Sequence, residues 1–124
     1  MSEKFELEYT FSTSPRVLFN RLSTPAGLAE WFADDVNLKN GLFSFVWDET
    51  EQFAEVVSRK DNNHIRFRWV EEGEETYFEF KIQKDELTGD LALLITDFAD
   101  KDEKEDAAGL WDTQIAELKH AIGL

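Results

Sequence analysis

Side chains that commonly perform chemistry in proteins are scarce in this chain. It contains no cysteine, which excludes disulfides, thiolate nucleophiles and thiolate metal sites. Its two histidines, His64 and His120, do not form the His-x-x-x-His pair of a helical zinc site. We expect His64 to begin a strand and His120 to lie near the end of the last helix, where a partial positive charge is favourable. We therefore predict no metal ligand and no catalytic role for either histidine.

Adjacent carboxylates at Asp34 and Asp35 come nearest to an acid–base pair. Two carboxyl groups can separate their pKa values and exchange protons with a substrate, but only when they are held close together and partly buried. Because the two residues directly follow a predicted helix, we favour a solvated turn and keep the acid–base pair as the alternative. The acidic segment 100–106 fails as a calcium loop, since Lys104 stands at a ligand position and Glu105 replaces the required glycine. We predict no catalytic residue, no metal site and no cofactor, and hence no enzyme.

Two arginines, Arg66 and Arg68, alternate with apolar residues in one predicted strand. Both should therefore lie on the polar face of a sheet. We expect them to form cross-strand ion pairs with Glu79 or its neighbours. The alternative is that they contact an anion or a protein partner.

Aromatic residues are abundant: eleven Phe, four Trp and two Tyr make up 14% of the chain. Such rings either fill a core or line a ligand pocket, and pockets are typically apolar with a few converging polar groups. Ser44 and Thr96 are the candidate polar groups, and the many inward rings favour a small or collapsed pocket over a roomy one. The candidate lining residues are Trp31, Phe43, Phe45, Trp47, Phe67, Trp69, Phe78, Phe80, Trp111 and Ile115.

The first thirty residues predict a strand and two short helices. Apolar and polar residues alternate over 5–11, which is typical of a strand with one buried face. Ser14-Pro15 and Thr24-Pro25 each combine an N-cap residue with a proline at the first helical position. Two short helices should therefore follow the strand, and the second should end at the Trp31-Phe32 pair.

The middle of the chain predicts a meander of about six antiparallel strands, because short alternating segments recur between turn signals. The inward-facing set of the whole sheet should be Phe5, Leu7, Tyr9, Phe11, Phe43, Phe45, Trp47, Ile65, Phe67, Trp69, Phe78, Phe80 and Ile82. Five of these strands cover 43–47, 53–58, 65–69, 78–82 and 91–98, with turns at 61–63, 71–75 and 88–90.

A helix should close the chain. Acidic residues over 102–106 suit the first turns of a helix, and Gly123 should end it. This helix is the only long amphipathic element that can cover the apolar face of the sheet. We expect the apolar stripe of this helix, which Trp111 begins, to face Phe45, Trp47, Phe67 and Trp69 on the sheet. The apolar stripe is formed by Ala108, Trp111, Ile115, Leu118 and Ile122.

The predicted fold is therefore a single α+β domain over residues 1–124, in the order β-α-α-β6-α, with a curved antiparallel sheet around the C-terminal helix. A length of 124 residues suits one domain and not two. A cystatin-like α+β roll is the alternative fold.

Three segments resemble the START-like (SRPBCC) superfamily, which has a helix-grip fold. The helix pair over 14–32 with its terminal Trp-Phe, the glycine-led strand over 41–45 and the Gly-x-Trp-Asp helix start at 109–112 are similar to the homologues of the activator of the heat-shock chaperone ATPase. The resemblance extends over nearly the whole chain, although this chain is unusually acidic at 71–75. It implies a cavity between the sheet and the last helix, in a superfamily whose members often bind lipids, sterols or polyketides.

Charge and hydropathy narrow the set of partners. Thirteen Lys and Arg against 27 Asp and Glu give a formal net charge of −14. Such a charge repels nucleic-acid phosphates and anionic membrane surfaces, so we predict no nucleic-acid partner and no membrane insertion. No cationic start followed by an apolar run marks a signal peptide, and we expect a cytoplasmic location.

Three functions remain as hypotheses. The first, which the resemblance favours, is a non-enzymatic domain that binds a small apolar ligand in a modest cavity. The second is a chaperone-associated or other protein-interaction module that uses its acidic surface. The third is an enzyme of the cyclase kind, for which only Asp34 and Asp35 offer candidate acid–base groups.

Overall fold

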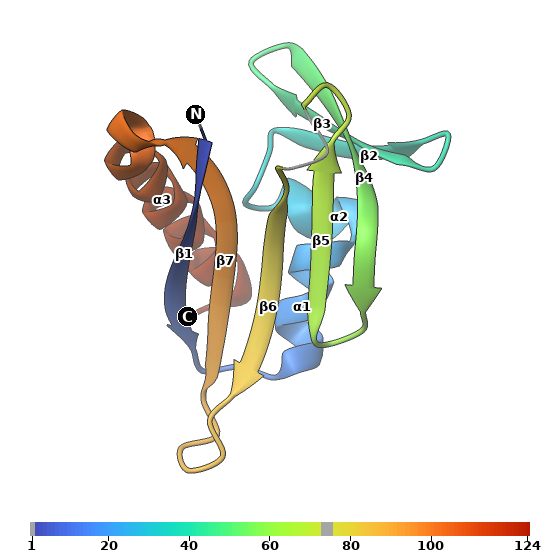
Figure 1. The fold of residues 1–124 in the computed structure, drawn as a ribbon. Helices are drawn as coiled ribbons and strands as arrows, with labels where there is room; N and C mark the ends of the chain where they lie inside the picture. The colour runs from blue at the N-terminus through green and yellow to red at the C-terminus, as the bar shows by residue number, and fades with distance from the viewer. Residues whose placement is uncertain (1, 73–75) are drawn as a thin grey trace.

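A computed structural model describes residues 2–72 and 76–124 (Figure 1). The predicted order of one strand, two helices, six strands and a long helix is confirmed. The predicted turn at 71–75 lies partly outside the described residues. The elements are β1 (Ser2–Phe11), α1 (Pro15–Ser23), α2 (Pro25–Ala29), β2 (Asp35–Lys39), β3 (Leu42–Trp47), β4 (Thr50–Lys60), β5 (His64–Trp69), β6 (Phe78–Lys84), β7 (Leu91–Asp100), the short 3₁₀ turn η1 (Lys101–Glu103) and α3 (Lys104–Ile122).

The seven strands form one antiparallel sheet in the order β1-β7-β6-β5-β4-β3-β2. The chain thus returns at its end to pair β7 with β1, and a register shift in β4 between Val56 and Ser58 interrupts the ladder with β5. All three helices lie on one side of the sheet (Figure 1). The antiparallel helix-grip architecture expected from the strand pattern is therefore confirmed.

The two short helices begin where the Ser-Pro and Thr-Pro pairs predict. Ser14 Oγ accepts a hydrogen bond from Val17 N at 3.1 Å, and Thr24 Oγ1 accepts one from Gly27 N at 3.0 Å. Thr24 also ends α1, because its backbone N–H donates to Asn20 O at 3.3 Å. One residue therefore closes α1 and opens α2, and the chain turns sharply between them.

The α3 helix is held against the edge of the sheet formed by β1. Tyr9 Oη donates to Asp112 Oδ1 at 2.6 Å, and Lys104 Nζ lies 2.6 Å from Glu3 Oε1. The helix ends at Gly123, which has a left-handed φ of +92° and donates to Lys119 O and His120 O. No helix within 2–72 and 76–124 is both long enough and apolar enough to span a bilayer.

The inward face of the sheet forms the core, as the alternation predicts. Eight members of the predicted inward set are buried, and the other five are partly buried: Phe5, Leu7, Tyr9, Trp47 and Trp69. The five partly buried residues lie on β1 and at the ends of β3 and β5.

The outer face of the sheet carries the ion pairs expected for the two arginines. Arg66 Nε lies 3.0 Å from Glu79 Oε1 on β6, and Arg68 pairs with Glu55 on β4. The Arg66 guanidinium also stacks on the Tyr77 ring, with 3.9 Å from its carbon to the ring centroid. Cross-strand pairing therefore accounts for both arginines.

Ser44 and Thr96 are not polar groups of an interior pocket, which corrects that expectation. Both are buried, but on the outer face of the sheet. Ser44 lies between the inward Phe43 and Phe45 and donates a short hydrogen bond to Glu51. Thr96 pairs in register with Glu79 of the outer face, so it points away from the helices. The reason is the strand period of two, which sends every second side chain to the opposite face.

Candidate functional site

A pocket of about 380 Å³ lies between the first half of α3 and the ends of β3, β5 and β7. We call it the tryptophan pocket, because three of the four tryptophans border it. Its lining combines a large aromatic surface with three polar side chains. The lining residues are Phe32, Trp47, Gln52, Trp69, Asp97, Ala107, Leu110, Trp111 and Gln114.

Four aromatic rings form a continuous wall of this pocket. The centroids of Trp69 and Trp47 are 6.0 Å apart, and those of Trp47 and Phe32 are 5.4 Å apart. Phe32 then stacks on Trp111 at 5.7 Å with 24° between the ring planes. The wall thus joins β5, β3, the end of the helix pair and α3, which are far apart in the sequence.

Backbone and side-chain hydrogen bonds fix this wall. The carbonyl oxygen of Phe32 accepts from Trp47 Nε1 at 2.8 Å and from Gln114 Nε2 at 3.0 Å. Since buried Trp N–H groups need a partner, this arrangement also satisfies the Trp47 indole. One carbonyl therefore connects the end of α2 to both β3 and α3 and sets the spacing of the rings.

Among the described lining residues, Asp97 supplies the one carboxylate of the tryptophan pocket. It accepts hydrogen bonds from Trp111 Nε1 at 2.9 Å and from the backbone N–H of Phe98 at 2.8 Å. Burial raises the pKa of Asp97 above its ordinary value, and the nearby Glu72 charge acts in the same direction, although the two hydrogen bonds oppose the shift. A carboxyl group with a raised pKa in an apolar pocket is typical of functional sites.

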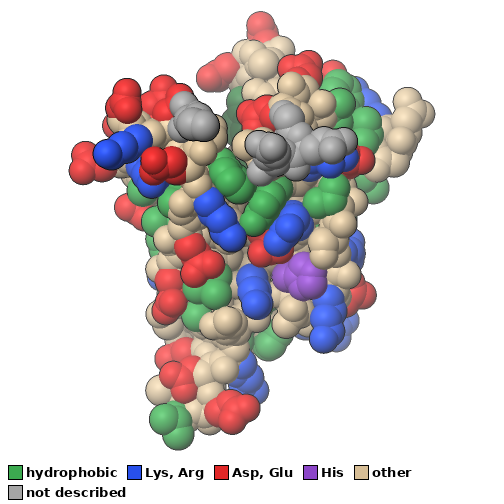
Figure 2. All heavy atoms as spheres, viewed as in Figure 1, with side chains coloured by type: hydrophobic (Ala, Val, Ile, Leu, Met, Phe, Trp, Pro, Cys, Tyr) green, Lys and Arg blue, Asp and Glu red, His purple; other side chains and the backbone are tan. Residues whose placement is uncertain are grey.

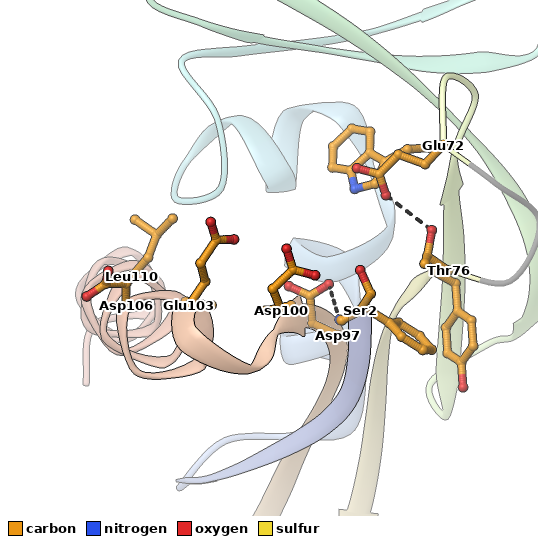
Figure 3. Close-up of a pocket in the computed structure, with 13 residues that line it drawn as sticks. Ser2, Glu72, Thr76, Asp97, Asp100, Glu103, Asp106 and Leu110 are labelled. Atoms are coloured by element: carbon orange, nitrogen blue, oxygen red, sulfur yellow. Dashed lines mark hydrogen bonds between the residues drawn. The ribbon is translucent and has the colours of Figure 1, made fainter.

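A second, more polar groove of about 760 Å³ adjoins the tryptophan pocket and shares Trp69, Asp97, Ala107 and Leu110 with it. We call it the acidic groove. Figure 3 shows Glu103 and Asp106 on one side of this groove and Glu72 on the other. Within the described ranges, no three His, Cys, Asp or Glu side chains are arranged to hold a metal ion. Its carboxylates are Glu72, Asp97, Asp100, Glu103 and Asp106.

The ten predicted lining residues divide into two groups. Trp47, Trp69 and Trp111 border the tryptophan pocket. The other seven are buried in the core, where the six aromatic ones pack ring against ring; the Phe67 and Phe78 centroids, for example, are 4.9 Å apart. These seven are Trp31, Phe43, Phe45, Phe67, Phe78, Phe80 and Ile115.

The Trp111 ring, at the start of the predicted stripe, contacts two rings outside the four that the stripe was expected to face. It stacks on Phe32 and meets Phe80 edge-on at 5.8 Å. The end of the helix pair carries Phe32 into the space between α3 and the sheet, so α3 packs on that ring. Trp111 borders the same pocket as Trp47 and Trp69.

The structure favours the solvated-turn interpretation of Asp34 and Asp35. Both are exposed, and their carboxylates make separate local hydrogen bonds. Asp34 Oδ2 accepts from Asp48 N at 3.0 Å, whereas Asp35 Oδ1 accepts from Val36 N at 3.0 Å. They serve as local caps for neighbouring backbone.

Sequence reasoning missed six of the nine residues that line the tryptophan pocket, among them Phe32, Asp97 and Gln114. The signal for Asp97 was present, because Leu91, Leu93 and Ile95 alternate onto the inward face and position 97 continues that stripe. A carboxylate on an inward stripe is a buried charge, and such groups are rare without a functional or structural reason. Phe32 and Gln114 gave no such signal, since their contacts depend on the tertiary arrangement.

Asp97→Asn should raise the thermal midpoint near pH 7. Because the folded state raises the pKa of Asp97, it binds this proton more tightly than the unfolded chain does. The resulting stabilisation is present at low pH and is lost as the pH rises through the folded-state pKa. Asparagine does not titrate, so the gain of the variant over the wild type should shrink below about pH 4, the ordinary range of an Asp side chain.

The control for this prediction is Glu8→Gln, which removes one negative charge from an exposed position on β1. In a chain of net charge −14, removing any negative charge reduces repulsion within the folded protein. Glu8→Gln measures this general effect, so that it can be subtracted. Differential scanning calorimetry at several pH values measures both variants. A midpoint for Asp97→Asn no higher than that of Glu8→Gln at pH 7 would contradict the prediction.

Comparison with known proteins identifies the family. A sequence model of the START-like superfamily domain matches residues 1–124. The chain belongs to the START-like superfamily. The START-like domain is 40% identical to the protein BfR322 from Bacteroides fragilis, over 99% of this chain and 93% of that one, with a TM-score of 0.70.

More distant solved structures share the fold of this START-like domain. The Aha1 dimer from Colwellia psychrerythraea matches with a TM-score of 0.80 at 16% identity, over 98% of this chain and 97% of that one. CalU16 from Micromonospora echinospora matches with a TM-score of 0.73 at 13% identity, over 98% and 75%. No curated protein sequence matches the chain.

Proposed function

We propose that this START-like domain binds a small, mainly apolar ligand in the tryptophan pocket and does not transform it. The observation that supports the proposal most directly is the composition of the lining: four aromatic rings, two aliphatic side chains and three polar groups around about 380 Å³. Ligand sites are typically clefts of roughly 300–1,000 Å³ with mostly apolar walls and a few fixed polar groups.

The fixed geometry of the ring wall adds support. Phe32, Trp47 and Gln114 are joined through one carbonyl oxygen, so the wall forms without a ligand. A preorganised site loses little conformational entropy when a ligand enters. A preorganised pocket favours ligand binding. Asp34 and Asp35 are both exposed, and therefore offer little to acid–base catalysis.

A titration with the neutral fluorescent probe N-phenyl-1-naphthylamine tests the proposal. We expect saturable binding with a rise in probe emission, and a loss of affinity of about tenfold in Leu110→Glu, which places a charge on the pocket wall. Leu110 is 61% exposed, so this change should leave the fold intact.

The matched control is Leu87→Glu, which makes the same change at a side chain that is 97% exposed in the β6–β7 turn. Its probe affinity should equal that of the wild type. Absence of saturable binding, or equal affinities in the two variants, would rule out the tryptophan pocket as the ligand site.

A further inference from the structure

We propose that the ligand of the tryptophan pocket is an organic cation, an apolar molecule that carries a substituted ammonium group. This inference rests on the proposed function and specifies the chemical class of the ligand. Three observations support it: the aromatic wall, the carboxylate of Asp97, and the distribution of charge around the opening.

The aromatic wall suits a cation. The face of an indole ring is the best aromatic partner for an ammonium group within about 6 Å of its centroid. Trp47 and Trp69 are only partly buried, and their planes are inclined at 61°. The wall therefore offers tryptophan ring faces in two orientations. An ammonium group in the pocket could contact both faces at once.

Asp97 provides the countercharge. Its carboxylate is held in place by Trp111 Nε1 and Phe98 N. Asp97 is partly buried, and a carboxylate withdrawn from water is costly unless it is paired. No basic side chain is among the described residues that line the pocket. A bound ammonium ion would provide the missing partner.

The same lining disfavours an anionic ligand such as a fatty acid. The polar groups present are the carboxylate of Asp97 and the side-chain amides of Gln52 and Gln114. The Gln114 amide already donates to Phe32 O, and the Trp111 N–H already donates to Asp97. A ligand carboxylate would therefore meet a like charge without a cationic partner.

The surroundings of the pocket favour the approach of cations. The acidic groove adds the carboxylates of Glu72, Asp100, Glu103 and Asp106 beside the opening. Figure 2 shows acidic side chains gathered around the start of α3, with basic side chains both among them and on the outer face of the sheet. With a net charge of −14, the field of the whole molecule attracts positive ligands and repels negative ones.

A pair of isosteric ligands tests this inference on the whole 124-residue chain. Benzyltrimethylammonium and neopentylbenzene have the same shape, and differ in a quaternary nitrogen that replaces a quaternary carbon. Shifts of the four indole N–H resonances in ¹⁵N-labelled protein report binding of each. We expect the cation to bind at least about tenfold more tightly, within the range that a desolvated cation–π contact supports.

Two variants show whether Asp97 is responsible. Asp97→Asn should weaken binding of the cation by about tenfold and change the affinity for neopentylbenzene less than about twofold. Asparagine keeps an oxygen that can accept from Trp111. The control Glu8→Gln removes the same charge from the exposed side of β1 and should leave both affinities unchanged at about 0.15 M salt, where distant charges are screened.

The outcomes separate this inference from the proposed function. Equal affinities for the two ligands, or tighter binding of the neutral one, would overturn the cationic ligand while the binding function stands. Binding of neither would overturn both. An affinity for the cation that Asp97→Asn leaves unchanged would also overturn the inference, because the countercharge would then lie elsewhere. If Asp97→Asn fails to fold, the comparison of the two ligands on the wild type still shows whether the pocket prefers a cation.

Discussion

Gly27→Ala should lower the free energy of unfolding by about 3 kcal/mol, at the upper end of the range for over-packing a buried position. A Cβ at this residue would lie 2.3 Å from Asn20 O and 2.7 Å from Arg21 Cα. Both are backbone atoms of α1, so no side-chain rotation can relieve the clash. The two short helices would have to separate, and this would displace Phe32 at the end of the pair. Urea unfolding of the variant and the wild type measures the difference.

Gly109→Ala is the matched control, with the opposite expected sign. Gly109 lies within α3, and a Cβ there would have open space around it. Alanine is favoured over glycine inside a helix by about 1 kcal/mol, so this variant should be more stable than the wild type. A Gly27→Ala variant as stable as the wild type would contradict the close approach of α1 and α2 at this residue.

Much of the fold could be predicted because its signals are local. Alternation over 5–11 fixes the buried face of β1, and the pairs Ser14-Pro15 and Thr24-Pro25 fix the starts of both short helices. The antiparallel meander follows from short strands separated by turn residues. In each case neighbours in sequence determine the conformation, so no tertiary information is needed.

The site could be predicted only in part, because it depends on which side chains meet in space. Three tryptophans of the pocket were named from composition and period, but Phe32 acquires its place from the sharp turn at Thr24. Ser44 was considered as a polar group of the pocket, although the alternation that makes Phe43 and Phe45 inward already assigns it to the polar face of the sheet. Asp97 was overlooked because the sequence from 97 to 106 contains six acids and two lysines, a composition that favours a solvated approach to the last helix.

Trp111→Ala should lower the free energy of unfolding by about 3–5 kcal/mol, a large share of the roughly 5–15 kcal/mol that a domain possesses. The ring is 6% exposed and packs on Phe32 and Phe80, so its removal leaves a cavity beside two large side chains. It also leaves Asp97 without the indole donor. Urea denaturation of each protein, analysed with a common slope, gives the difference.

Trp111→Phe separates the contribution of ring packing from that of the hydrogen bond to Asp97. Phenylalanine keeps an aromatic ring against Phe32 but removes the N–H that Asp97 accepts, so the loss should be smaller, about 1–3 kcal/mol. If Trp111→Ala is nearly neutral while neutral probes still bind saturably, then Trp111 lines an open cavity and adds little to packing. If Trp111→Ala is nearly neutral and the wild type binds no probe, Trp111 does not belong to the core. This result would also remove the contact through which α3 closes on the ring of Phe32, and hence the wall that defines the pocket.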